Sequence, residues 1–367
     1  MSIGQSRSAF AVDRCSNVTL PGLPDAMNIP SCSPPVWKNL YDAAIAFKEI
    51  ACWEWMSDSD IFGVQNPETG EVGYCCVLGR LGEVFGLAVY LGSEGLEQYR
   101  KVQSGKVDAR SPDFAYSQNC LTAWFGDRND LDQADLKVVK ELGLKFRGSN
   151  AWPQFRSLQP GYLPWHLTEG EARYLAVSVE QAQEVALCLN KDPNWLSGPG
   201  KNHYLVRVPV DRESGGSWES HWLTPAPIAK PSVRSYPLDE VRLRRIRNAA
   251  VTRHGIWEVD AFYMPTPVEG EGRLYFPYSI LAADHQSGFI LGSVLAEPSE
   301  WEAKFPPGIL DCIENNNVLP SALWVRKEEL RDLLEPLTSR LDIAVHLIRK
   351  LPEIDRARRA MVKYFRR

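Results

Sequence analysis

The sequence predicts an α+β protein with two domains, and three observations support this fold class. The chain has 367 residues, more than the ~100–200 residues of a typical single domain. Four prolines stand between positions 225 and 237, and proline-rich composition produces extended spacers. On both sides of this stretch, strand-like runs are interspersed with helical periodicity. We therefore expect an N-terminal arm at 1–35, an α+β domain at 36–224, a linker at 225–238 and a second α+β domain at 239–367.

Composition excludes several classes of protein. Hydrophobic residues make up 44% and charged residues 24% of the chain, which suffices for a core and excludes wholesale disorder. No uncharged apolar run reaches the ~18–20 residues of a membrane helix, and the N-terminal arm lacks the pattern of a signal peptide. The net charge of -5 excludes a protein that is basic overall, although it is compatible with local basic patches.

The cysteines and histidines indicate neither a metal site nor a disulfide framework. The eight cysteines form no C-x-x-C pair, and the six histidines are scattered singly. Adjacent Cys75 and Cys76 lie in an apparent strand, so their side chains should point to opposite faces. We expect buried free thiols in a reducing cytoplasm, with no metal held by these residues.

The first domain is expected to open with a helix followed by an antiparallel meander. From Trp37 to Met56, apolar residues recur at three- and four-residue spacing, which predicts a helix with one buried face. Three β-type runs follow, separated by turns that contain proline and glycine. These runs predict strands at Ile61–Gln65, Val72–Leu78 and Val84–Leu91.

The rest of the first domain combines helices and strands with an aromatic segment between Trp152 and Trp165. Residues 162–165 within it are not expected to form a central strand, because Pro164 lacks the donor that a sheet requires. Thr168 and Glu171 form a capping box that opens a helix to about Leu189. The other expected elements are a helix at Ser93–Gln103, a strand at Leu121–Phe125, a helix at Leu131–Leu142, and a hairpin of Tyr204–Val210 and Trp218–Leu223 that turns at 214–216.

The second domain should contain three antiparallel strands, then helix, strand, helix, strand and helix. Asp239 is expected to cap a basic helix that ends near Ala250. The late strands are joined through helices, so they should be parallel and should complete a five-stranded mixed sheet. The expected strands are Gly255–Met264, Leu274–Asp284, Phe289–Ala296, Ala322–Val325 and Ile343–Ile348, and the helices are Ser299–Asn315, Lys327–Arg340 and Glu353–Phe365.

This order of elements resembles the RNase H-like fold. Trp257-Glu258-Val259-Asp260 is similar to the W-x-x-D opening of transposase and retroviral-type integrase cores. The run from Ile280 to Gly292 is similar to their second and third strands. The resemblance covers roughly residues 250–365.

The resemblance implies a set of carboxylates that holds two divalent ions at adjacent strand ends. Asp260 matches the first position, and Glu353 or Asp355 on the last helix would supply the third. Arg326 and Lys327 stand where the second acid belongs, and a cation cannot ligate Mg²⁺. We therefore expect a catalytically inert fold without a cofactor. The alternative is a divergent nuclease or phosphodiester-transfer enzyme that uses Asp260 with Mg²⁺ or Mn²⁺.

Asp284, at the end of the second strand, has no standard role in that family, but it completes the set of candidate acids. A plainer interpretation applies to Asp260, Asp284, Glu353 and Asp355 alike. Acids are common at strand ends and at helix N-termini, where the helix dipole favours negative charge.

The whole chain also resembles a family of uncharacterised bacterial proteins built from two adjoining domains of unknown function. The similar order of elements in the two halves further suggests an internal duplication, with the N-terminal domain as a divergent repeat. In that alignment, Gly82–Val89 is equivalent to Ser287–Val294, and Leu121–Phe125 to Ser321–Val325. Convergence on a common α+β pattern is the alternative.

Two clusters of positive charge are candidate binding surfaces for nucleic acid or an acidic protein. Positions 356, 359, 363 and 367 share one face of the predicted last helix, where they could contact phosphates. The alternative is a solvated helix face paired with the protein's own acids. The candidate residues are Arg242 and Arg245 before the second domain, and Arg356, Arg359, Lys363 and Arg367 at the end of the chain.

Aromatic side chains form another candidate surface, comprising Trp152, Phe155, Tyr162, Trp165 and His166. They could stack on bases of single-stranded nucleic acid, or they could pack as a small core under a long loop. The sequence contains no G-x-S-x-G, P-loop or G-x-G-x-x-G motif. Hydrolase triads, nucleoside triphosphatases and Rossmann enzymes therefore have no positive support.

Overall fold

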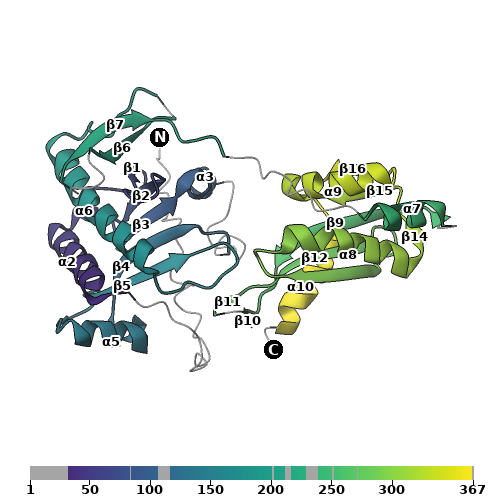
Figure 1. Ribbon diagram of the computed structural model, residues 1–367, viewed down its shortest axis with the longest axis horizontal. Helices are drawn as coiled ribbons and strands as arrows, with labels where there is room; N and C mark the ends of the chain where they lie inside the picture. Colours follow the sequence, from purple (N-terminus) through teal and green to yellow (C-terminus); the bar gives the residue numbers. More distant parts are fainter. Residues whose placement is uncertain are drawn as a thin grey trace, which may run out of the picture. The chain divides into compact units, whose positions relative to one another are not determined.

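In the computed structural model, the chain divides into two compact units, Met1–Ile228 (unit 1) and Ala229–Arg367 (unit 2) (Figure 1). The structure describes residues 32–82, 84–105, 116–200, 202–210, 216–228, 239–249, 252–270 and 272–365. Most of the predicted arm and linker, much of the predicted hairpin turn and the candidate Arg367 lie outside these residues.

Unit 1 is built on a seven-stranded sheet with the order β5-β4-β3-β2-β1-β6-β7. Neighbouring strands are antiparallel except β1 and β6, which are parallel. The predicted meander is confirmed as the first three strands. The strands are β1 (Phe62–Gln65), β2 (Val72–Leu78), β3 (Phe85–Leu91), β4 (Cys120–Gly126), β5 (Trp152–Leu158), β6 (Tyr204–Pro209) and β7 (Trp218–Leu223).

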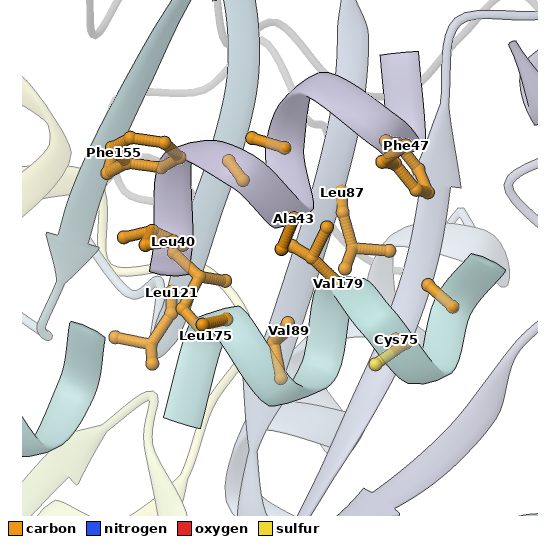
Figure 2. Packing of buried hydrophobic residues seen from close by; sticks show 14 of the residues in the cluster. Leu40, Ala43, Phe47, Cys75, Leu87, Val89, Leu121, Phe155, Leu175 and Val179 are labelled. Atoms are coloured by element: carbon orange, nitrogen blue, oxygen red, sulfur yellow. The ribbon is translucent and has the colours of Figure 1, made fainter. Parts of the chain in front are cut away.

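Helices cover both faces of this sheet. The larger core lies under α2 and α6, and Figure 2 shows Leu40 and Phe47 of α2 packed with Val179 of α6 over the strands. The smaller core, on the other face, includes Leu96 of α3. Cys75 belongs to the first core and Cys76 to the second, as the alternation of the strand predicts. The helical elements are α2 (Pro34–Ile50), η1 (Cys52–Glu54), α3 (Gly92–Gln103), η2 (Arg128–Asp130), α5 (Gln133–Glu141) and α6 (Glu169–Lys191).

Two details of unit 1 differ from the sequence-based expectation. The first helix begins at Pro34, within the predicted arm, because proline is tolerated at the first helical positions. It ends at Ile50 rather than Met56, since Ala51 adopts a left-handed conformation with φ of 52°. The aromatic segment also contains an additional strand, β5, whose Pro153 is tolerated because β5 lies at the edge of the sheet.

Unit 2 contains the predicted five-stranded mixed sheet, with the order β13-β12-β9-β15-β16. The three strands β13, β12 and β9 are antiparallel, and β15 is parallel to both β9 and β16. The strands are β9 (Ile256–Tyr263), β12 (Tyr278–Asp284), β13 (Ile290–Ala296), β15 (Ala322–Val325) and β16 (Ala344–Leu347), and four two-residue strands, β8 (Thr252–Arg253), β10 (Val268–Glu269), β11 (Leu274–Tyr275) and β14 (Val318–Leu319), form two small ladders.

The helices of unit 2 also lie on both faces of its sheet. Apolar residues of α7, α8 and α9 form a core with Trp257 and Val259, whereas α10 covers the other face through Ile354. Asp239 caps α7 as predicted, accepting a hydrogen bond from the backbone N–H of Arg242. The helices are α7 (Glu240–Asn248), α8 (Trp301–Asn316), α9 (Glu328–Arg340) and α10 (Pro352–Phe365).

The alignment proposed for an internal duplication is wrong in its fourth strand. In unit 1, β4 pairs with β3 and is antiparallel to it. In unit 2, the supposed equivalent β15 pairs with β9 and is parallel to it. Similar local sequences therefore occupy different positions in the two sheets, because pairing is decided by long-range packing rather than by the strand sequence alone.

The aromatic centre of the larger core in unit 2 provides a test of how that core is packed. Phe305 is fully buried, with ring centroids 5.5 Å from Tyr278 and 5.6 Å from Trp301. We expect Phe305→Ala to lower the free energy of unfolding by about 3–5 kcal/mol in urea denaturation. Phe289→Ala, at a side chain that is 63% exposed, should change it by less than about 0.5 kcal/mol. Equal effects of the two substitutions would contradict the packing.

Candidate functional site

Strand β9 carries two acids into the interior of unit 2. Its side chains alternate between the faces of the sheet, so Trp257 and Val259 join the core under α8 and α9. Phe262 packs on the opposite face with α10. Glu258 and Asp260 precede it by even numbers of residues, so their side chains point to the same face as Phe262. Both acids are fully buried. A buried carboxylate requires compensating partners, and the two acids obtain them differently.

Asp260 faces a guanidinium rather than another acid. Its Oδ1 accepts a hydrogen bond from the Ala261 N–H, whereas Oδ2 has no hydrogen-bond partner among the described residues. The guanidinium of Arg326 forms an ion pair with this oxygen, since its Nη1 lies 3.8 Å from Oδ2. Nη2 of the same guanidinium donates to Oδ1 of Asp355 on α10 at 2.6 Å. Arg326 thus lies between the acids at the predicted first and third positions.

Lys327 adds positive charge at the same end of the sheet. Its Nζ donates to the Ala261 carbonyl at 2.6 Å and lies 3.2 Å from the Tyr278 hydroxyl. Burial raises the pKa of Asp260, and the charges of Lys327, Arg326 and Arg358 oppose that rise only in part. This concentration of cations around one carboxylate would repel a divalent ion.

Glu258 is compensated by the last helix. Its Oε2 accepts hydrogen bonds from the backbone N–H groups of Glu353 and Ile354, at 2.9 and 3.2 Å. These donors belong to the first turn of α10 and have no partner within the helix. The other oxygen, Oε1, lies 2.6 Å from Nδ1 of His285, whose ring packs on Trp324. Glu258 therefore holds the N-terminus of α10 against β9.

The remaining candidate acids have local structural roles. Asp284 Oδ1 accepts hydrogen bonds from the Ser287 N–H and hydroxyl in the turn after β12. Burial works to raise the pKa of Asp284, but these bonds outweigh it and hold the pKa below its usual range. Glu353 is paired with Arg356 one turn along α10. Among the described residues, none of these four acids belongs to a cluster of three or more potential metal ligands whose atoms lie within 4.8 Å of one another; the acids are Asp260, Asp284, Glu353 and Asp355.

The basic candidates divide into paired and unpaired sets. Arg242 and Arg245 of α7 both contact Glu314 of α8 at 2.6 Å, which fits the expectation that they pair with the protein's own acids. On α10, Arg359 and Lys363 are exposed and form no ion pair with the described residues. Tyr364, with 74% of its surface accessible, directly follows Lys363 and points about 100° away from it around the helix axis.

The aromatic candidates do not form a common exposed surface. Trp165 is buried and bridges to Ser157 of β5, and Trp152 packs on Phe146. Phe155 belongs to the larger core of unit 1. Tyr162 is only half-buried. The structure therefore supports the alternative that these aromatic side chains pack within the protein.

A buried charged network in unit 1 was not identified from the sequence. Arg156 of β5 donates to both carboxylate oxygens of Asp135, at 2.9 and 2.6 Å, and to Asp132 at 3.2 Å. Nε2 of His166 lies 3.1 Å from Asp132 Oδ2. One local signal of this network is present in the sequence, because Asp132 and Asp135 have capping-box spacing at the start of α5 and do form that box.

Asp132, Asp135 and His166 are the described residues whose ligand atoms lie close enough together to hold a metal ion. Arg156 nevertheless occupies both oxygens of Asp135, so a divalent ion would have to displace a guanidinium that is 90% buried or bind beside it. Burial works to raise the pKa of Asp132, but the His166 hydrogen bond and the charge of Arg156 outweigh it and hold that pKa below its usual range. The network is therefore internally compensated and fits a metal poorly.

The network should be important for the stability of unit 1. Asp135→Ala leaves the buried Arg156 guanidinium without its bidentate partner, and we expect a loss of about 3–5 kcal/mol of unfolding free energy in urea denaturation. The matched control is Asp42→Ala, which breaks the exposed pair with Lys38 and should cost at most about 1 kcal/mol. A small effect of Asp135→Ala would show that Arg156 is not held as described.

Comparison with known families assigns each unit separately. Residues 37–207 match the family model of a domain of unknown function (DUF7309), and residues 242–362 match that of a second domain of unknown function (DUF6930). No curated protein matches the chain. Among the described residues, no helix has the length and apolar character to cross a membrane. The chain thus carries two adjoining domains of unknown function, one in each unit, which confirms that part of the resemblance.

Proposed function

We propose that the protein is a non-catalytic binding protein of the bacterial cytoplasm, in which unit 2 is an RNase H-like domain that has lost its metal chemistry. The observation that carries this proposal is the Arg326 guanidinium, 3.8 Å from Asp260 and 2.6 Å from Asp355. The sheet order β13-β12-β9-β15-β16 supports the RNase H-like assignment, because it has the three antiparallel and two parallel strands that the resemblance implies.

The charge balance supports a loss of catalysis. A two-metal site stabilises the attacking and leaving oxygens of a phosphodiester with divalent ions that carboxylates hold. Here the Arg326 guanidinium bridges the corresponding carboxylates and already neutralises part of their charge. While the guanidinium is there, two metal ions cannot lie between these carboxylates to bind a phosphate oxygen. The candidate alternative, a nuclease using Asp260 with Mg²⁺ or Mn²⁺, would require Arg326 to move away.

The outer face of α10 is the proposed binding surface, with single-stranded nucleic acid as its partner. Arg356, Arg359 and Lys363 are exposed, and their three- and four-residue spacing aligns them along one face of the helix, while the exposed Tyr364 lies to one side of that face. The cations Arg359 and Lys363, which form no ion pair with the described residues, can contact phosphates and release counterions, whereas Arg356 is paired with Glu353. An aromatic ring such as that of Tyr364 can stack on a base. An acidic protein would use the cations but would gain nothing specific from Tyr364.

The state of the cysteines supports a cytoplasmic location. The seven cysteines within the described residues are free thiols, and six of them are buried. Burial raises the pKa of Cys52 to about 12 and that of Cys32 to about 11, so these thiols remain protonated and unreactive at neutral pH. Buried protonated thiols suit a structural role in a reducing compartment.

Divalent metal ions should not stabilise the native protein. Only a ligand of the folded state raises the melting temperature, so we expect no rise with Mg²⁺ or Mn²⁺ in differential scanning fluorimetry. Arg326→Ala should lower the melting temperature, because it removes the cation beside buried Asp260, and should make it rise with Mn²⁺. Arg349→Ala, at an exposed residue, is the control and should have neither effect. Stabilisation of the native protein by Mn²⁺ would favour the nuclease.

Retention on immobilised single-stranded DNA tests the binding surface. We expect the full chain to be retained at low salt and released as salt rises, and the double variant Arg359→Glu, Lys363→Glu to lose retention. Lys137→Glu with Lys140→Glu makes the same charge change on exposed positions of α5 and should leave retention unchanged. Equal loss in both double variants would indicate a general charge effect, and binding to polyglutamate but not DNA would identify an acidic protein as the partner class.

A further inference from the structure

The sheet of unit 2 carries an aromatic surface beside the N-terminus of α10. Trp324 of β15 lies in register with Glu258 of β9 and with His346 of β16, so these three side chains point to the same face of the sheet. It is the face that α10 covers through Ile354. The ring of His285 packs on Trp324, with the ring centroids 4.3 Å apart. We call His285, Trp324 and His346 the sheet platform.

The sheet platform is accessible and held in place. The side chain of His285 is 35% exposed, His346 is exposed and Trp324 is half-buried. Nδ1 of His285 lies 2.6 Å from Oε1 of the fully buried Glu258, and this contact holds the ring against Trp324 whichever of the two groups carries the proton. A ring that is already fixed loses little conformational freedom when a flat ligand stacks on it. The sheet platform is therefore preorganised for a planar group.

The loop that follows β16 places two cations at the edge of the sheet platform. Ile348 and Leu351 pack in the same apolar cluster as Trp324, so this loop crosses the sheet next to the platform. Arg349 and Lys350 lie between them in the chain. Both are exposed, and neither forms an ion pair with the described residues. An aromatic surface bordered by cations suits a ligand that combines flat rings with negative charge.

The sheet platform is continuous with the cationic side of α10. Arg326, which directly follows β15, donates to Asp355, so position 355 of α10 faces β15. Arg359 lies about one helical turn farther along the same side. Glu353, two residues before Asp355, points to the other side of the helix and is paired with Arg356. One nucleic-acid strand can therefore contact Arg359 and the sheet platform together.

We propose that the sheet platform stacks on a base of single-stranded nucleic acid while Arg349 and Lys350 contact the adjacent phosphates. This stacking site rests on the function proposed for α10 and extends the binding surface beyond that helix. Stacking tolerates any sequence, because every base has a π-face. The platform should therefore distinguish a strand that has bases from one that has phosphates alone.

Fluorescence anisotropy of the full chain with labelled oligo(dT) and with an abasic strand of equal length tests this assignment. The two strands carry the same phosphates, so we expect oligo(dT) to bind at least about tenfold more tightly through its bases. Trp324→Ala and His346→Ala should each lower the affinity for oligo(dT) by at least about fivefold and leave that for the abasic strand unchanged. His346 is exposed, so its variant tests the site even where Trp324→Ala fails to fold. The matched control is Trp195→Ala, at a tryptophan of unit 1 that is 37% exposed, and it should change neither affinity.

Three results would overturn the stacking site. Equal affinity of the native protein for both strands would show that only phosphates are contacted, and the function proposed for α10 would still stand if Arg359→Glu with Lys363→Glu lowers both affinities. An unchanged affinity for oligo(dT) in folded Trp324→Ala and His346→Ala would place the stacking elsewhere, such as at Tyr364. Binding of neither strand would overturn the stacking site and the function proposed for α10 together.

Discussion

The guanidinium of Arg326 allows two carboxylates to approach each other at one end of the sheet of unit 2. Asp260 is fully buried on β9, and removing an ionised carboxylate from water costs several kcal/mol unless opposite charge lies nearby. Arg326 supplies that charge while also binding Asp355, so it links the central strand to α10. The same position would have to be vacated for a divalent ion. Structural compensation and metal binding therefore exclude each other at this site.

The second buried acid of β9 connects this interior to the surface. Glu258 accepts hydrogen bonds from the first turn of α10, and its contact with His285 reaches the turn between β12 and β13. The orientation of α10 is thus set from the centre of the sheet. Ile354 faces the sheet as a result, while Arg359 and Lys363 remain exposed for a partner. The proposed binding surface depends on the buried acids in this indirect way.

Sequence patterns predicted the elements of unit 2 well, because alternation along strands and proline or glycine at their ends are local signals. The cation at the position of the second acid was also predictable, because Arg326 directly follows the fourth predicted strand in the sequence. The contacts of Glu258 with residues 353 and 354 were not predictable, because they join positions 95 and 96 residues apart. In unit 1, Arg156 and Asp132 are 24 residues apart, and only the pairing of β4 with β5 and the packing of α5 bring them together. The edge strand β5 was not predicted from the aromatic, proline-rich segment, and Pro164, which argued against a central strand, lies outside it.

Crystals of the native protein grown with Mn²⁺ test the central claim most directly, through anomalous scattering at the manganese absorption edge. We expect no anomalous peak near Asp260, with the Arg326 guanidinium in contact with Asp355. An ion coordinated by oxygens of Asp260 and Asp355, with Arg326 displaced, would contradict the claim and would identify unit 2 as a metal-dependent enzyme.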